Sequence, residues 1–298
     1  MIKTFALFGN IYQDSKSAAI SEVMSSLKEC GARVLIEKEY YDFLCRSKLI
    51  SGEGVDTFSG DGFECDFAIS MGGDGTLLRT ASLVGSKSVP ILGVNIGRLG
   101  FLADSNADDF HNTLQSLYSG DYTTEQRALI QVETGGVEPA ASLCSQGACC
   151  ALNDVAILKR DTASMIGIRV CIDGEYLTTY QADGLIVSTP TGSTAYSLSN
   201  GGPIIAPGTG VMLLTAVAPH SLNVRPVVIP DAAVLDITVS SRSHTFLVAI
   251  DGRSTAMPED TTLRLHRAPY KVRVVKRAGT NYFRTLREKM MWGADMRK

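Results

Sequence analysis

Short apolar runs alternate with helical periodicity through the first hundred residues of the chain. The apolar runs cover residues 4–9, 32–37, 66–73 and 89–97, and the helical patterns cover 17–30 and 76–84. Strands that alternate with helices need crossover connections, which produce a parallel sheet. The stretch 46–62, rich in Gly, Ser and Asp, has no clear period, and we expect an exposed loop there. The pattern predicts an α/β domain.

The pattern changes near residue 125. From there the segments are rich in β-branched residues, often alternate polar with apolar positions, and are separated by Gly, Asp or Pro. Such spacing is typical of an antiparallel sandwich. Residues 135–150 interrupt it, and we expect a hairpin excursion there. The last segment, residues 281–293, has amphipathic helical spacing, which predicts packing against a domain surface.

Composition limits the classes of partner. A chain of 298 residues that is 45% apolar favours two domains. The net charge of −3, with scattered Lys and Arg, argues against a nucleic-acid partner. No apolar run reaches the roughly 18–20 residues of a membrane span, so we expect no membrane partner. The seven cysteines form no pair of Cys-x-x-Cys units, which argues against a disulfide framework and a zinc ribbon. We therefore expect a cytoplasmic protein in which the adjacent Cys149 and Cys150 are buried thiols.

A Gly-Gly-Asp-Gly sequence follows one of the predicted strands directly and precedes a helical pattern. Gly72, Gly73 and Gly75 can adopt positive φ and bring backbone N–H groups to an anion, and the helix N-terminus adds a favourable dipole. Asp74 places a negative charge where a phosphate would lie. That position favours holding a cation or taking a proton from an attacking hydroxyl. The alternative is a strand-to-helix turn in which Asp74 caps the helix, and the motif alone leaves both open.

A second polar block lies at residues 181–204. Small hydroxyl residues surround Pro190 and Gly192 there, namely Ser188, Thr189, Thr191, Ser193 and Thr194. This composition suits close contact with a ligand that carries many ribose and phosphate oxygens. The alternative is a hairpin turn rich in Ser and Thr, but the block is much longer than the roughly 2–5 residues of such a turn.

Two shorter segments also suggest a ligand site. Residues 97–102 follow the last predicted parallel strand, where the carboxyl ends of an α/β sheet usually form a crevice. Phe101 in this segment could stack on a base or belong to the core. Asn153 and Asp154 interrupt an apolar strand, where they could hold a ribose diol or a base edge, or form an Asx turn or bulge.

Taken together, these residues resemble bacterial NAD kinases. The blocks Gly72–Thr76, Asn153–Asp154 and Asp183–Ser199 have the order and separation of that family's three diagnostic blocks, and Phe283–Gly293 extends the likeness to the tail. The resemblance implies transfer of the γ-phosphoryl group of ATP to the 2′-hydroxyl of the adenosine ribose of NAD, with Mg²⁺ accompanying ATP. It also implies a homodimer or homotetramer whose ligand site is completed by a neighbouring subunit.

The fold that the resemblance implies is α/β plus all-β. An N-terminal Rossmann-like domain with a parallel sheet would cover residues 1–105, and a C-terminal β-sandwich that binds NAD would cover 106–275. The tail 276–298 would return to pack on the first domain.

The resemblance also assigns roles by position. Asp74 becomes the catalytic base near the 2′-hydroxyl, Gly72, Gly73 and Gly75 the phosphate loop, and Arg79 a phosphate contact. No residue is expected to bind a metal directly. The expected NAD contacts are Phe101, Asn153, Asp154, Ser164, Gln181, Asp183, Thr194, Ala195, Tyr196, Ser197, Leu198, Ser199 and Arg253.

Within this set, Asp183 would face the nicotinamide, the stretch 194–199 would line the adenine pocket, and Arg253 would lie at its edge. Several positions depart from the family pattern. Asp154 replaces a glutamate that is one methylene longer, and Ser164, Gln181 and Arg253 differ from the side chains most relatives carry.

Two other functions fit part of the sequence. Diacylglycerol and sphingosine kinases share Gly-Gly-Asp-Gly, but they need an apolar acceptor pocket, which the polar block 183–199 does not provide. A non-catalytic regulator that senses NAD or NADP would bind nucleotide without turnover. An acid on a phosphate loop favours the enzyme over the regulator.

Overall fold

The computed structural model describes residues 2–11, 17–50, 55–97, 100–103, 105–135, 149–161, 164–276 and 281–291. The chain divides into two compact units. The first unit comprises Met1–Gln126 and Val272–Lys298, and the second unit comprises Arg127–Lys271. The first unit is therefore built from both ends of the chain.

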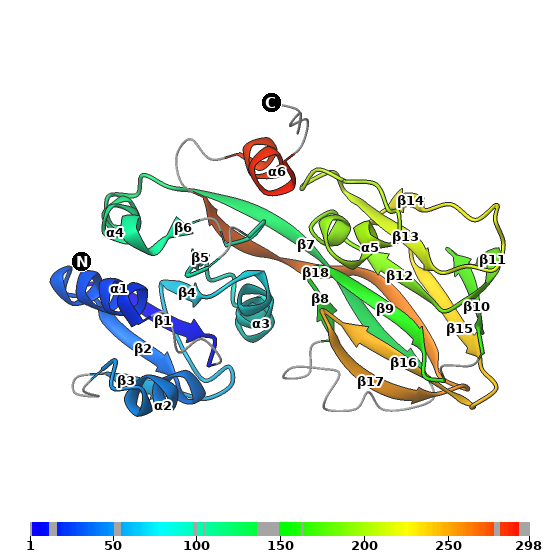
Figure 1. Cartoon of the computed structure of the whole chain (residues 1–298), viewed down its shortest axis with the longest axis horizontal. Coiled ribbons are helices and arrows are strands. Elements are labelled where there is room, and N and C mark those ends of the chain that lie inside the picture. The colour runs from blue at the N-terminus through cyan, green and yellow to red at the C-terminus, as the bar shows by residue number, and fades with distance from the viewer. Residues whose placement is uncertain are drawn as a thin grey trace. The chain divides into compact units, whose positions relative to one another are not determined.

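A parallel sheet forms the centre of the first unit, in the strand order β3-β2-β1-β4-β5 (Figure 1). Its strands are β1 (Thr4–Gly9), β2 (Arg33–Glu37), β3 (Asp56–Phe58), β4 (Phe67–Met71) and β5 (Ile91–Asn95), and the short β6 (Ser105–Asn106) pairs with β5. β4 and β5 are buried along their whole length, as near-continuous apolar runs in a parallel sheet predict. The predicted Rossmann-like architecture is confirmed.

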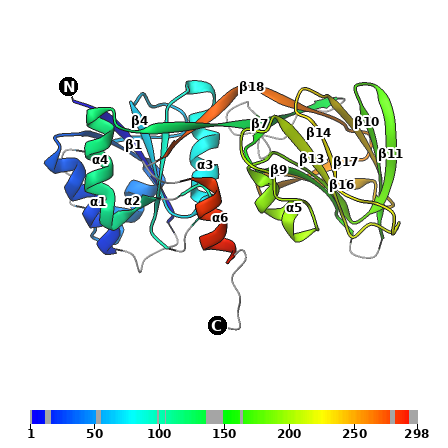
Figure 2. The same cartoon turned by 90° about the horizontal axis from the view of Figure 1, so that it is seen from above.

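Helices cover both faces of this sheet (Figures 1 and 2). α1 (Ser17–Glu29) and α4 (Phe110–Ser119) lie on one face and α3 (Asp74–Val84) lies on the other. α4 buries Phe110 and Leu114 in the same core as the sheet, so the first unit continues beyond residue 105, the domain boundary that the resemblance implied, to the region near residue 125 where the sequence pattern changes. None of the described helices has the length and apolar character that crossing a membrane would require.

The segment expected to be an exposed loop contains structure. α2 (Lys38–Arg46) extends into its first residue, and β3 adds an edge strand to the sheet. Phe58 of β3 is buried edge-on against Phe8, with 5.3 Å between ring centroids. The expectation of a loop throughout 46–62 is therefore wrong at β3, because one buried aromatic in a three-residue strand leaves no period to detect.

Two antiparallel sheets form the second unit. One contains β11-β10-β15-β18 with β7 and β8, and the other has the order β14-β13-β12-β9-β16-β17. Their strands are β7 (Thr123–Gly135), β8 (Cys150–Ala151), β9 (Asp154–Lys159), β10 (Ile166–Ile172), β11 (Glu175–Ala182), β12 (Gly184–Ser188), β13 (Val211–Val217), β14 (Val227–Pro230), β15 (Leu235–Ser240), β16 (Thr245–Ile250), β17 (Arg253–Pro258) and β18 (Thr262–Lys276). Inward side chains of both sheets share one core, which confirms the predicted sandwich. Most of the expected excursion, residues 136–148, lies outside the described residues.

Long strands connect the units along the chain. β18 begins in the second unit and ends in the first, where Val274 pairs in parallel with Ile91 of β5. The chain then forms α6 (Tyr282–Met290), whose N-cap Asn281 accepts a hydrogen bond of 2.9 Å from the backbone N–H of Arg284. The last described helix therefore belongs to the first unit.

The two adjacent cysteines differ in their chemistry. Cys150 is a buried free thiol whose pKa is raised by burial, against the opposing effect of a hydrogen bond from Tyr270. Cys149 takes part in a disulfide. The interpretation of both as buried thiols is therefore wrong for Cys149.

Candidate active site

The Gly-Gly-Asp-Gly sequence forms the turn between β4 and α3. None of its three glycines has a positive φ, and Gly73 is extended with φ −93° and ψ −167°. The left-handed conformation that is open to glycine is therefore not used in this turn. A Cβ on Gly72 would lie 2.2 Å from Thr76 Oγ1, whereas a Cβ on Gly73 or Gly75 would meet open space. The fold itself does not require glycine at 73 and 75, and their missing side chains leave the N-terminus of α3 uncovered.

A cavity of about 470 Å³ lies at this helix N-terminus. Its lining comes from three elements of the first unit, namely Gly9, Asn10, Ile11, Glu39, Gly73, Gly75, Thr76 and Arg79. The first N–H groups of a helix have no intrahelical partner, and the helix dipole adds partial positive charge there. The cavity therefore suits an anion such as a phosphate.

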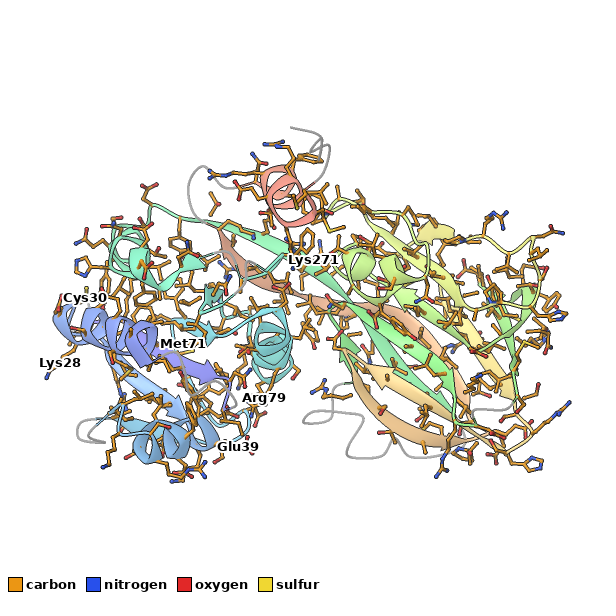
Figure 3. All side chains as sticks on the ribbon, in the orientation of Figure 1. Lys28, Cys30, Glu39, Met71, Arg79 and Lys271 are labelled. Carbon is orange, nitrogen blue, oxygen red and sulfur yellow. The ribbon has the colours of Figure 1, made fainter. Side chains whose placement is uncertain are left out.

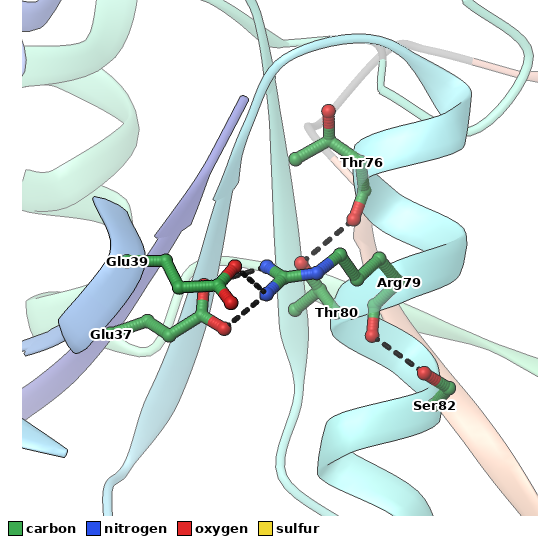
Figure 4. A network of polar contacts seen from close by, with 6 residues as sticks. All are labelled: Glu37, Glu39, Thr76, Arg79, Thr80 and Ser82. Carbon is green, nitrogen blue, oxygen red and sulfur yellow. Dashed lines mark hydrogen bonds and ion pairs between the residues drawn. The ribbon is translucent and has the colours of Figure 1, made fainter. Parts of the chain in front are cut away.

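Arg79 forms one wall of this cavity, but carboxylates hold its guanidinium (Figures 3 and 4). It donates from both terminal nitrogens to Glu37, at 2.6 Å for Nη1, and from Nη2 to Glu39 at 3.2 Å. Glu37 is buried, and its hydrogen bonds raise the pKa of Arg79. A phosphate would have to compete with these two acids, so the contact expected of Arg79 stays a prediction.

The Asp74 side chain points away from its own helix. Its Oδ2 accepts a hydrogen bond of 2.9 Å from the Phe101 N–H, and its Oδ1 accepts bonds of 3.0 and 3.2 Å from the N–H groups of Leu102 and Ala103. Lys289 Nζ of α6 lies 3.2 Å from Oδ2. Because Gly73 is the N-cap of α3 and no side chain caps that helix, the alternative in which Asp74 is the cap is wrong.

Opposing effects set the acidity of Asp74. Burial raises its pKa, but the N–H groups of Leu102, Phe101 and Ala103 and the charge of Lys289 together outweigh burial and lower the pKa below its usual value. The group is therefore a carboxylate at neutral pH.

Phe101 lies beside this carboxylate and is half-buried. Lys289 Nζ is 4.3 Å from the centroid of its ring, and the Tyr282 ring is 6.4 Å away. Phe101 is therefore neither a core residue nor freely exposed. Sequence reasoning missed Lys289, because a lysine near the end of an amphipathic tail carries no sign of the acid that it meets.

In the second unit, a buried acid holds the Asn153–Asp154 turn. Asp251 Oδ1 accepts hydrogen bonds of 2.8 and 3.2 Å from the N–H groups of Asn153 and Asp154, and Oδ2 accepts one of 2.8 Å from Leu152. Asp251 was not among the predicted residues. The Asp-Gly pair at 251–252 was the available signal, but it is equally common in ordinary turns.

Burial also changes the acidity of this pair. Burial, with the charge of Asp251, raises the pKa of Asp154 to about 7. The pKa of Asp251 is also raised by burial, against the three N–H groups and the charge of Arg253. Asp154 is therefore divided between its neutral and charged forms at neutral pH, so that it can donate or accept a hydrogen bond.

The hydroxyl-rich block packs directly on this turn. The Thr189 N–H donates to the Asn153 carbonyl at 2.9 Å, and a Cβ on Gly192 would lie 2.1 Å from the same oxygen. The block continues into a 3₁₀ turn, Gly192–Thr194, and the short helix α5 (Tyr196–Ser199). Asn153, Asp154 and the start of the block therefore form one cluster, which we call the turn cluster.

Side chains of the block divide into internal and exposed groups. The Ser197 hydroxyl is buried and lies 2.8 Å from Thr215 Oγ1, so it stabilises the block itself. Tyr196 and Ser199 are exposed, and Thr194, Ala195 and Leu198 are half-buried. These five residues remain available to a ligand.

The hydroxyl-rich block follows the end of β12, whereas three other predicted residues lie near the start of that strand. Ser164 and Gln181 line a cavity of about 490 Å³ together with Arg242 and Glu259. Asp183, which precedes β12, pairs with Lys159 at 2.7 Å. Since β12 runs for five residues between Asp183 and the block, the two ends are roughly 17 Å apart. The structure therefore does not bring all the predicted contacts to one place in the second unit.

Comparisons with known proteins agree along the chain. The family model of the ATP-NAD kinase N-terminal domain matches residues 5–122, and the family model of the ATP-NAD kinase C-terminal domain matches residues 152–277. The NAD kinase of Bacteroides fragilis is 49% identical over 297 residues, covering 98% of this chain and 99% of that protein. The NAD kinase of Porphyromonas gingivalis is 42% identical over 301 residues, covering 99% and 100%.

Two solved structures share the fold. Yeast NADH kinase in complex with NADH superposes with a TM-score of 0.87 at 22% identity, covering 99% of this chain and 89% of that chain. An NAD kinase from Archaeoglobus fulgidus in complex with ATP gives a TM-score of 0.73 at 22% identity, covering 97% and 98%.

Proposed function

The chain belongs to the NAD kinase family, and from this premise we propose which of its residues transfer the terminal phosphoryl group of ATP to the adenosine 2′-hydroxyl of NAD. The predicted family, activity and class of enzyme are confirmed. The observation that carries the proposal is the position of Asp74, a carboxylate that stands between two glycines lining the cavity at the N-terminus of α3.

Asp74 acts as the base. Phosphoryl transfer depends on placement of donor and acceptor and on stabilisation of charge, and the acceptor hydroxyl loses its proton as the new bond forms. The hydrogen bonds that lower the pKa of Asp74 make it a weak base. We therefore place the proton transfer late, when bond formation has already made the hydroxyl acidic.

The cavity at the start of α3 holds the phosphates of ATP. The N–H group of Gly75, with the helix dipole, faces negative charge there, and the open space above Gly73 admits it. Mg²⁺ is bound mainly by phosphate oxygens and water in such sites. Among the described residues no cluster of three or more His, Cys, Asp or Glu could hold a metal. Glu39, an exposed acid of the cavity wall, is the group suited to contact the hydrated ion, which would neutralise charge on the phosphates.

The turn cluster holds the adenosine part of NAD. Asp154, partly neutral at pH 7, can donate to a ribose oxygen or accept from a ribose hydroxyl, and Asn153 offers an amide beside it. We assign contact with the base to the exposed side chains of the segment 194–199 and to Arg253. In the first unit, the ring of Phe101 offers a face on which a base can stack.

Ser164, Gln181 and Asp183 serve the ligand of a neighbouring copy. The separation of roughly 17 Å between Asp183 and the turn cluster along β12, and the cavity that Ser164 and Gln181 share, support this assignment. Exposed apolar side chains on the second unit, including Leu222 at 88% exposure and Val228 at 48%, support a homo-oligomer. We place this assembly in the cytoplasm. Light scattering of the purified protein measures its mass directly.

Replacing Asp74 tests the assignment. The assay supplies NAD, ATP and Mg²⁺ and detects NADP with a dehydrogenase that accepts no NAD. We expect Asp74→Asn to bind NAD normally and to lose about two orders of magnitude in kcat, the usual scale for removing a general base. Asp56→Asn, in an exposed ion pair of the same unit, is the matched control and keeps wild-type activity. An active Asp74→Asn would remove this residue from the mechanism.

A further inference from the structure

Asp74 is surrounded by four hydrogen-bond donors. The N–H groups of Phe101, Leu102 and Ala103 and the ammonium of Lys289 share its two oxygens. An ionised carboxylate offers about four lone-pair sites. In this state the carboxylate has no site left for a proton from a substrate hydroxyl, so one donor must leave before Asp74 can act.

The three backbone donors are held in place. Leu102 and Ala103 are buried, and Ala103 packs so closely on β5 that a Cβ on Gly93 would lie 2.7 Å from the Ala103 Cα. Moving these N–H groups would require the segment after β5 to leave the core of the first unit. The backbone donors are therefore fixed relative to Asp74 by this packing.

Lys289 is the donor that can move. Its side chain is 31% exposed and that of Asp74 is 28% exposed, and ion pairs with such access to water are weak. It stands in the last turn of α6, on a flexible stem, with the Phe101 ring 4.3 Å from its nitrogen. A rotation of the side chain alone frees Oδ2.

We propose that Lys289 contacts the transferred phosphoryl group: it occupies Asp74 Oδ2 while the site has no substrate, and moves to the γ-phosphoryl oxygens of ATP when the nucleotide binds. This inference rests on the function proposed above. The vacated Oδ2 then accepts the hydrogen bond of the 2′-hydroxyl. Lys289 thus has two successive partners, each negatively charged.

The chemical step balances without any further reactant. The 2′-oxygen forms a bond to the γ-phosphorus while the bond from that phosphorus to the bridging oxygen of ADP breaks, and the electron pair of that bond stays on ADP. The hydroxyl proton passes to Asp74 Oδ2. Lys289 keeps its proton and stabilises the negative charge on the phosphoryl oxygens.

Three variants test the proposal. Lys289→Met removes the charge and keeps most of the length of the side chain, Lys289→Arg keeps the charge, and Arg287→Met is the matched control on an exposed position of the same helix. The measurements are kcat, KM for ATP and for NAD, the pH dependence of kcat/KM, and the thermal transition of each variant.

We expect Lys289→Met to lose at least tenfold in kcat and to raise KM for ATP several-fold, while KM for NAD changes less than twofold. Lys289→Arg recovers most of the activity, and Arg287→Met matches the wild type. The acid limb of the kcat/KM profile moves to higher pH in Lys289→Met, because Asp74 loses the one charged group that lowers its pKa. If Lys289 served only to pack α6, its replacement would leave the acid limb of the kcat/KM profile at the same pH.

Two results would overturn the inference. Unchanged kcat and KM in Lys289→Met would show that the lysine takes no part, and a raised kcat would show that it only blocks Asp74. Failure of the wild-type protein itself to form NADP from NAD and ATP would instead refute the proposed function, so the two failures are distinguishable.

Discussion

Replacing Asp154 by Asn should make the stability difference from the wild type depend on pH. Asp154 is buried, and its pKa is raised from 3.8 to about 7. Because folding favours the protonated form, its contribution to stability is complete below the unfolded pKa near 3.8 and is lost as pH rises through about 7. With 1.36 kcal/mol for each pKa unit, the loss between pH 5 and pH 8 is about 2.5 kcal/mol. Asparagine does not titrate, so the free energy of unfolding of the variant does not fall by this amount between pH 5 and pH 8.

Urea unfolding at pH 5 and pH 8 measures the effect. The free energy of unfolding of Asp154→Asn, minus that of the wild type, should increase by about 2.5 kcal/mol between the two pH values. Asp251 is present in both chains, so most of its own titration cancels in the difference. Asn153→Ala is the control, because it alters the neighbouring position without removing an ionisable group. A difference that stays constant within about 0.5 kcal/mol would refute the reasoning.

Two glycine substitutions should separate binding from folding. Gly73→Ala adds a methyl group to open space, so unfolding in urea should be unchanged while KM for ATP rises about tenfold or more; an unchanged KM would place the phosphates elsewhere. Gly192→Ala would put a Cβ 2.1 Å from the Asn153 carbonyl oxygen, and we expect it to cost about 2–3 kcal/mol in the same unfolding experiment, with a raised KM for NAD. Wild-type stability in Gly192→Ala would show that the block can move away from the turn.

The sequence predicted the fold well where a period was long enough to see. α1 carries Ile20, Val23 and Leu27 on one buried face, and β4 is apolar throughout, so both elements follow from their patterns. β3 has three residues, and its pairing partner Leu35 is distant in sequence. Such a strand forms because the edge of β2 is available for pairing, and the local sequence pattern does not show that edge.

Prediction of the site was less complete, since sequence shows which residue types are present but not where a side chain points. The Gly-Gly-Asp-Gly turn was found, yet Asp74 proved to accept hydrogen bonds from a segment 27 or more residues away. Asp251 and Lys289 act on residues that are 97 and 215 positions distant, and neither belongs to a recognisable motif. Contacts of this kind depend on the tertiary fold.

The first unit is interrupted in sequence, and this affects how the protein can be made. Residues 1–126 leave the ribosome first, but Val274 of β18 and all of α6 arrive only after the whole second unit has been synthesised. Folding during translation usually proceeds domain by domain from the N-terminus. Here the growing chain must keep one edge of an unfinished sheet beside β5 until its last residues emerge. A nascent chain stalled before residue 272 would therefore hold a folded sandwich next to an incomplete partner, a state that chaperones would recognise.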